Sequence, residues 1–232
     1  MKATGHEATK IREVTPHIAP ATEEGHRLAG LRIRDYGDVA IDLNWERYFG
    51  TVQAQATQAL QHPLAVFLGG NHSVAVLLIE AFNERITGQS GVIHIDAHLD
   101  LVDTFQGHRW PPACTARRVL EQSNVYPKHL TFIGIHSFMD EELTFLETHS
   151  EIGVHLAHDV ACLGVVAVAK DVHMQLQDMD AAYVTLDIDA LDLAYAPGTG
   201  TPEAGGLSTR ELLELLWGIF AEIHNICYYV GE

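Results

Sequence analysis

The feature that most constrains the fold of this chain is an alternation of short apolar segments with longer amphipathic ones. Apolar runs of four to six residues are typical of buried strands, and the stretches between them are long enough for helices. The expected strands cover residues 31–35, 64–68, 91–95, 130–135, 153–156, 181–186 and 225–230. The expected helices cover residues 44–61, 72–86, 113–123, 139–149, 160–177 and 208–222. This order predicts an α/β protein whose parallel sheet lies between helices.

The composition is that of one acidic globular domain. The 232 residues are 47% apolar and 19% charged, which fits a single domain over residues 1–232. A formal charge of −17 argues against nucleic acid or an anionic membrane as a partner, and suits a cationic ligand or metal ions. The sequence shows no signal-peptide core and no apolar run of membrane-spanning length. Its three cysteines lack CxxC spacing, so we expect a cytoplasmic protein.

Ligands of open parallel sheets bind beyond the carboxyl ends of the strands, and the first such end here is LAVFLGGNHS. Two glycines permit a tight turn, and His72 follows at the start of the next expected helix. Taken alone, this pattern is equally typical of a plain turn with a capping polar residue.

The second strand end, GVIHIDAHLD, is more specific. Asp96, His98 and Asp100 lie at positions i, i+2 and i+4, which point to one side of an extended chain. Solvated loops also gather acidic residues, but seldom directly after a fully apolar strand. His94, inside the strand, is interpreted as a buried core histidine rather than a ligand.

The third strand end carries Asp187 and Asp189, with Asp192 close behind and a long Gly/Pro-rich loop after it. The spacing fits neither a calcium-binding EF-hand nor a phosphate-binding loop. Together the three ends supply two histidines and four aspartates. Such donors, without thiolate, favour Mn²⁺ or a similar ion over structural zinc. Two ions roughly 3.5–4 Å apart, sharing carboxylates, would use all six donors.

These motifs resemble a known family. GGNHS, DAHLD and TLDIDALD followed by APGTGTPEAGGL are similar, in order and spacing, to the three signature motifs of the ureohydrolases, which include arginase, agmatinase, guanidinobutyrase and formimidoylglutamase. The resemblance covers residues 60–215, and the wording of the third motif is nearest the agmatinase-like branch. It implies an arginase-like three-layer α/β/α sandwich with a central, mostly parallel sheet. It also implies two Mn²⁺ per chain, hydrolysis of a small guanidino compound to urea and an amine by a metal-bridging hydroxide, and a homo-oligomer of three or six chains.

The family's ligands are carried over position by position. The resemblance implies that one ion is held by His72, Asp96, Asp100 and Asp187. It implies that the other is held by Asp96, His98, Asp187 and Asp189. Asp96 and Asp187 would therefore bridge the ions, and Asp189 would also pass a proton to the leaving amine. His108 is the nearest match to a family proton-shuttle histidine, with an exposed loop histidine as the open alternative.

Recognition of a cationic guanidino substrate calls for a carboxylate. The family places a glutamate after the last core strand, and Glu232 matches that position to within one residue. The alternative is that Glu232 is an exposed acid at the end of the chain without a role in binding. Glu203 is a second candidate, although a structural role in its loop would explain this residue equally well. Compared with the family, the chain is expected to be shortened at both ends. The alternative functions are a formimidoylglutamase-type hydrolase and a truncated metal-binding paralogue without turnover.

Overall fold

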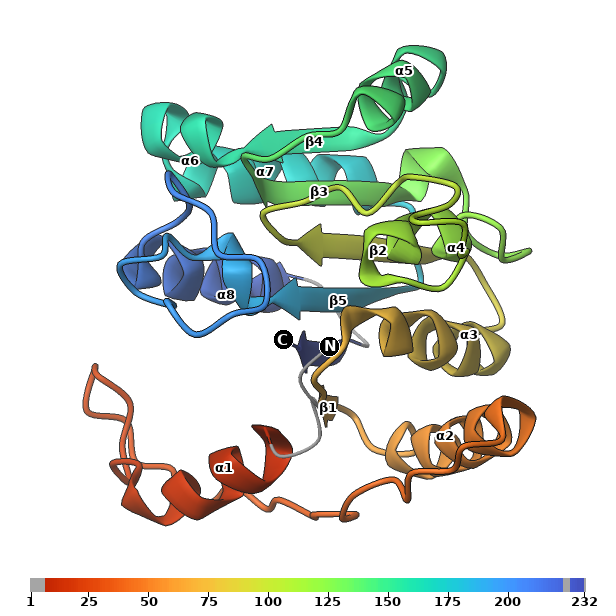
Figure 1. The fold of residues 1–232 in the computed structure, drawn as a ribbon. Coiled ribbons are helices and arrows are strands. Elements are labelled where there is room, and N and C mark those ends of the chain that lie inside the picture. Colours follow the sequence, from red (N-terminus) through yellow and green to blue (C-terminus); the bar gives the residue numbers. More distant parts are fainter. Residues whose placement is uncertain (1–6, 223–225, 232) are drawn as a thin grey trace.

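A computed structural model describes residues 7–222 and 226–231 of the chain. Its centre is a six-stranded sheet in the order β1-β6-β5-β2-β3-β4, and every neighbouring pair of strands is parallel. Figure 1 shows the sheet side on, with β4 at the top and β1 near the bottom. The strands are β1 Ala65–Leu68, β2 Ser90–Ile95, β3 Leu130–Ile135, β4 Gly153–Leu156, β5 Ala181–Asp187 and β6 Ile226–Gly231. The parallel sheet predicted from the apolar runs is confirmed.

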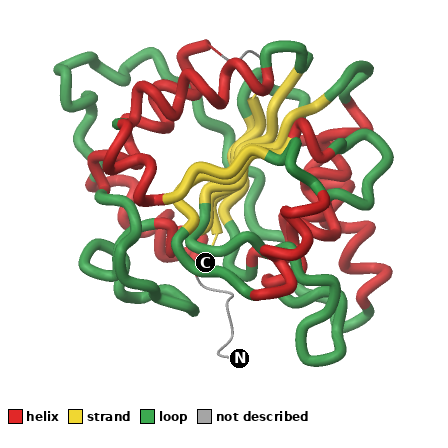
Figure 2. The backbone as a smooth tube through the Cα atoms, turned by 90° about the horizontal axis from the view of Figure 1, so that it is seen from above, coloured by secondary structure: helices red, strands yellow, loops and turns green. Residues whose placement is uncertain are grey.

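Helices cover both faces of the sheet, which confirms the three-layer arrangement (Figure 2). They are α1 Glu7–Val14, α2 Trp45–Ala59, α3 Ala75–Arg85, α4 Thr115–Val119, α5 Asp140–Thr148, α6 Ala157–Leu163, α7 Val165–Leu176 and α8 Thr209–Glu222. One apolar core lies between the sheet and α2, α3 and α4, and a second lies between the sheet and α6, α7 and α8. None of the described helices is long and apolar enough to cross a bilayer.

Side-chain alternation along the central strands divides the two cores. In β2, Val92 faces the core under α2–α4, whereas Ile93 and Ile95 face the core under α6–α8. In β5, Tyr183 faces the core under α2–α4 and Val184 faces the core under α6–α8. Because successive strand residues point to opposite faces, continuous apolar runs of this kind belong to strands buried on both sides.

Some predicted elements are wrong. Residues 31–35 form no strand, and Leu31 and Ile33 are 62% and 79% exposed. Their alternation resembles a half-buried strand, but β1 is the sheet edge and the segment pairs with no described strand. The predicted helix 160–177 is divided into α6 and α7 because Gly164 adopts a φ of +86°. The predicted helix 113–123 is too long: the structure has only the short helix α4 there, preceded by a single 3-10 turn, Pro112–Cys114.

The long loop after β5 is closed by a short backbone bridge between Leu191 and Leu207. The amide of Asp192 donates to the Leu207 carbonyl (2.9 Å), and the amide of Leu207 donates to the Ala190 carbonyl (2.9 Å). The Asp192 carboxylate accepts the amides of Ala194 (2.9 Å) and Gly205 (2.7 Å). Asp192 therefore organises the loop.

Gly206 is the position where this closure tolerates no side chain. A Cβ atom there would lie 2.6 Å from the Asp192 amide nitrogen and 2.7 Å from the Ala190 carbonyl oxygen. We predict that Gly206→Ala lowers the free energy of unfolding by about 1–3 kcal/mol, because backbone atoms must shift to relieve the contact. Gly198→Ala in the same loop is the matched control, since its Cβ would meet no atom within 4 Å. Equal denaturant midpoints for the two variants would contradict this account.

Candidate metal centre

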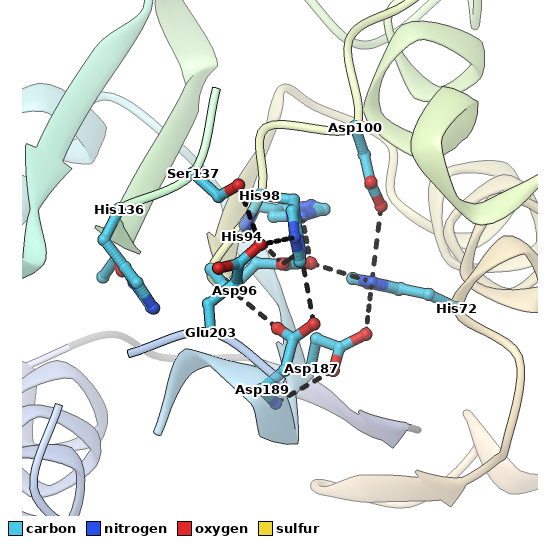
Figure 3. Close-up of polar contacts among 12 residues, drawn as sticks. His72, His94, Asp96, His98, Asp100, His136, Ser137, Asp187, Asp189 and Glu203 are labelled. Atoms are coloured by element: carbon cyan, nitrogen blue, oxygen red, sulfur yellow. Dashed lines mark hydrogen bonds and ion pairs between the residues drawn. The ribbon is translucent and has the colours of Figure 1, made fainter. Parts of the chain in front are cut away.

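The carboxyl ends of three strands bring the predicted ligands together in one buried cluster (Figure 3). His72 opens a 3-10 turn (His72–Val74) that follows β1. The motif after β2 supplies Asp96, His98 and Asp100. Asp187 ends β5, and Asp189 lies in the 3-10 turn Ile188–Ala190 directly after it. Figure 3 shows the six side chains converging from these separate segments.

His72 is the centre of one half of the cluster. Its Nδ1 lies 3.0 Å from Asp96 Oδ2, 3.2 Å from Asp187 Oδ2 and 3.6 Å from Asp100 Oδ2. Its Nε2 lies 2.8 Å from the Thr185 hydroxyl. Thr185 can accept the Nε2 proton, so Nδ1 faces the carboxylates, which is the orientation of a metal-ligating histidine once Nδ1 has lost its own proton.

His98 is the centre of the other half. Its Nδ1 lies 3.2 Å from Asp189 Oδ2 and 3.4 Å from Asp96 Oδ1. The His98 side chain is 25% exposed, whereas the aspartates around it are buried, so this half forms the mouth of the cluster. Asp96 presents one carboxylate oxygen to each half, which is the arrangement that a bridging carboxylate requires.

Backbone amides fix the orientation of these carboxylates. Asp96 Oδ1 accepts the amide of His98 (2.7 Å), and Asp187 Oδ1 accepts the amide of Asp189 (3.1 Å). Asp189 Oδ1 accepts the amide of Ala97 (3.1 Å), which ties the end of β5 to the end of β2. In each case the other oxygen of the carboxylate is directed toward a histidine of the cluster.

Burial and the crowding of carboxylates shift the pKa values of the cluster. Burial, followed by repulsion from Asp96, raises the pKa of Asp187 to about 6. Burial also raises the pKa of Asp100 and Asp189. Burial acts the same way on Asp96, but hydrogen bonds with His72 and its histidine neighbours outweigh it and hold the pKa of Asp96 well below its usual range. Among the described residues, these four carboxylates form ion pairs with histidines and with no lysine or arginine.

The donors fit divalent metal ions. Two groups each have donor atoms within 4.8 Å of one another: His72, His94, Asp96 and Asp100, and Asp96, His98 and Asp189. Carboxylate oxygens and imidazole nitrogens without thiolate are the donors preferred by Mn²⁺-like ions, and clustered carboxylates need such a counter-charge. The individual ligand assignments stay predictions.

Three further residues support the cluster, and the sequence interpretation did not give them this role. His94, interpreted as a core histidine, is buried, but its Nε2 lies 2.9 Å from Asp96 Oδ2 and its ring stacks on that of His72 at 4.8 Å. Thr185 pairs with His94 across the sheet and orients His72. Strand alternation already places His94 on the side of Asp96 and Thr185 on the side of Asp187. Asn71 Oδ1 accepts the amide of Ser73 and so caps the turn that begins with His72.

The remaining predicted residues lie at the rim or outside the cluster. Glu203 Oε1 lies 3.9 Å from His98 Nε2 and accepts the Ser137 hydroxyl at 3.3 Å. Figure 3 shows Glu203 approaching the cluster from the side opposite His72. His108 is exposed, its backbone pairs with Phe105, and the contacts described within the cluster do not include it. Its role as a proton shuttle stays a prediction. Glu232 lies outside the described residues.

Comparison with known proteins shows what the chain is similar to. The model of the arginase family matches residues 4–228. The chain is 33% identical over 211 residues to an agmatinase of Halalkalibacterium halodurans, covering 90% of this chain and 67% of the relative. It is 29% identical over 218 residues to the mitochondrial arginase 1 of Arabidopsis thaliana, covering 88% and 60%. The crystal structure of formimidoylglutamase from Bacillus subtilis superimposes with a TM-score of 0.88 at 25% identity, covering 99% of this chain and 74% of that one. The chain thus spans about 60% to two thirds of the length of these two sequence relatives.

The protonation of His98 generates a prediction about metal binding. Burial lowers the pKa of His98, but hydrogen bonds with Asp189 and Asp96 outweigh it and raise the pKa to about 11. His98 is therefore protonated at neutral pH in the metal-free chain and must lose its proton to become a ligand. We predict that Mn²⁺ binding releases at least about one proton per chain and that affinity rises with pH between 6 and 9.

Calorimetric titration of Mn²⁺ in two buffers of different ionisation enthalpy measures this release directly. The apparent binding enthalpy should differ between the buffers, and His98→Asn should reduce the difference. Identical enthalpies in both buffers for the unmodified chain would contradict the protonation state assigned to His98.

Proposed function

This chain belongs to the arginase family, and we propose that it hydrolyses a small guanidino compound to urea and an amine. The observation that carries the proposal is the buried cluster of four carboxylates and two imidazoles, in which Asp96 contacts both histidines. Family membership supports a hydrolase, and the cluster supports metal-dependent chemistry.

The proposed cofactor is a pair of Mn²⁺ ions. One ion would be held by His72, Asp96, Asp100 and Asp187. The other would be held by Asp96, His98, Asp187 and Asp189. When bound, such ions supply the positive charge that lowers the pKa of water toward neutrality and polarises the group under attack.

The side chains of the cluster have defined tasks in this proposal. The oxygen of water adds to the central guanidino carbon, the bond from that carbon to the amine nitrogen breaks, and the amine leaves protonated. We assign proton transfer to Asp189 Oδ2: both protons of the water end on the departing nitrogen, so that a guanidinium and water give neutral urea and an ammonium group. The amide of Ala97 holds the other oxygen and so fixes the direction of Oδ2.

Recognition of the substrate is proposed for Glu203. Its side chain is 43% exposed, lies at the mouth next to His98, and is oriented by the Ser137 hydroxyl. A carboxylate in this position suits a planar guanidinium or a cationic tail, and the net charge of −17 would draw a cation toward the site. Glu232 is proposed as a second substrate contact because of the family motif alone. Agmatine and guanidinobutyrate are the first substrates to test.

A formimidoyl substrate is the second candidate. The formimidoylglutamase structure that superimposes on nearly the whole chain supports it, because the same kind of cluster would act on the related C–N bond and release formamide.

The proposal extends to location and assembly. Cys114 and Cys162 are free thiols, which suits the cytoplasm. A homo-oligomer of three or six chains is proposed from the family resemblance. Apolar side chains exposed on α7 and α8 support a contact between copies, namely Val166 (83%), Leu213 (54%) and Trp217 (65%).

A panel of substrates tests the proposed function. After Mn²⁺ reconstitution, we predict urea release from agmatine or guanidinobutyrate, with arginine and formimidoylglutamate as comparison compounds and formamide measured for the latter. Asp187→Ala should lower the rate at least about 100-fold, because a ligand proposed to be shared by both ions is lost. Asp171→Ala, at an exposed acid on α7, is the control. If no compound of the panel releases product while two Mn²⁺ per chain are bound, turnover is contradicted and a metal-binding chain without activity is favoured.

A further inference from the structure

Glu142 lies on α5, outside the predicted ligand set, yet it is almost fully buried, with 3% of its surface exposed. Its Oε1 accepts the amide of Leu101 at 2.9 Å, and its Oε2 accepts the amide of Met139 at 2.9 Å. One carboxylate therefore joins the start of α5 to the segment that follows Asp100. From this contact we infer that Glu142 is a positioning residue of the metal centre, which holds Asp100 in the orientation of a ligand. The inference rests on the proposed function of the cluster.

The backbone at Asp100 needs such a constraint. Asp100 has a φ of +54°, a left-handed backbone conformation that residues other than glycine rarely adopt. A residue persists in this conformation where its surroundings fix it. The Asp100 carboxylate reaches 3.6 Å from His72 Nδ1, so its backbone orientation decides whether it belongs to the cluster.

The peptide group between Asp100 and Leu101 is fixed at both of its polar atoms. Its carbonyl oxygen accepts the amide of Arg117 at the start of α4 (3.1 Å), and its N–H donates to Glu142. Leu101 is fully buried, so water cannot easily replace Glu142 as the acceptor. Without Glu142 the peptide group would retain one of these two contacts, and rotation of the peptide would carry the Asp100 side chain away from His72.

The effect should be confined to one half of the cluster. Asp100 contacts His72, whereas the described ion pairs of His98 are with Asp96, Asp189 and Glu203. The start of the same loop has its own support, because the Ala97 carbonyl accepts the amides of His136 and Ser137 at 3.0 Å each. Loss of the Glu142 contact should therefore weaken the ion next to His72 and leave the ion next to His98 in place.

Glu141 provides a matched control. It lies on the same turn of α5, carries the same charge and also accepts an amide of the loop, that of Asp103 at 2.9 Å. Glu141 is exposed, so water can take its place, and the amide that it binds is three residues beyond Asp100. Glu141→Gln and Glu142→Gln thus remove equal charge from the helix N-terminus, but they differ in their connection to Asp100.

The test is Mn²⁺ titration of the full chain, followed by calorimetry and by the electron paramagnetic resonance signal of coupled Mn²⁺ pairs. Glu142→Gln should weaken one of two binding steps by about 10- to 100-fold and diminish the coupled signal, because support of a ligand is lost. Glu141→Gln should keep both binding steps and the coupled signal. In an Asp100→Asn background, adding Glu142→Gln should cause no further loss, because Glu142 acts through Asp100.

The inference is overturned if Glu142→Gln binds two ions like the unmodified chain, if both binding steps weaken equally, or if its effect adds fully to that of Asp100→Asn. A merely structural role would lower the melting temperature of the metal-free chain without separating the two steps. Should Glu142→Gln fail to fold, Glu142→Asp, whose shorter side chain cannot span both amides, is judged by the same criteria. Metal binding requires no turnover, so an inactive chain that binds two ions contradicts the proposed function alone. An unmodified chain that binds no Mn²⁺ overturns both.

Discussion

The crowding of four carboxylates in a buried space is the constraint on which the rest of this structure depends. Burial and mutual repulsion raise the pKa of Asp100, Asp187 and Asp189, so the charged cluster opposes folding in the absence of a counter-charge. Backbone amides and the histidines of the site offset part of this cost. Divalent cations would offset the remainder, which is why the arrangement is difficult to explain as a structural feature alone.

The parallel sheet makes this crowding possible. Strands β2 and β5 are neighbours, and the pairing of His94 with Thr185 brings the segments after both strands to one place. Because side chains alternate between faces, a shift of one residue in this register would move Asp96 and Asp187 to opposite sides of the sheet. The apolar alternation that separates the two cores therefore also positions the charged site. The left-handed backbone of Asp100, which costs about 1–2 kcal/mol in a residue with a Cβ atom, is a point where the loop departs from ordinary geometry, and Gln106 (φ +52°) is another.

Much of the fold and most of the candidate site could be predicted from the sequence, because the relevant signals are local. Apolar runs identify the buried strands, and i, i+2, i+4 spacing identifies the convergent residues after β2. The errors arise where the outcome depends on distant parts of the chain. Segment 31–35 alternates like a strand but has no strand beside it, and no sequence pattern reports that. The contacts of Thr185 with His72 and of Glu142 with Leu101 join residues 113 and 41 positions apart. His108 is exposed and does not take part in the contacts described within the cluster, so its role as a proton shuttle stays a prediction.

We propose that six side chains hold two divalent ions and that Asp96 and Asp187 are shared between them. Anomalous diffraction from Mn²⁺-soaked crystals at the manganese absorption edge would locate the ions relative to these residues. We expect two peaks per chain, one beside His72 and Asp100 and the other beside His98 and Asp189, with Asp96 and Asp187 between them. A single peak at saturating Mn²⁺, or two peaks that do not share these carboxylates, would contradict it.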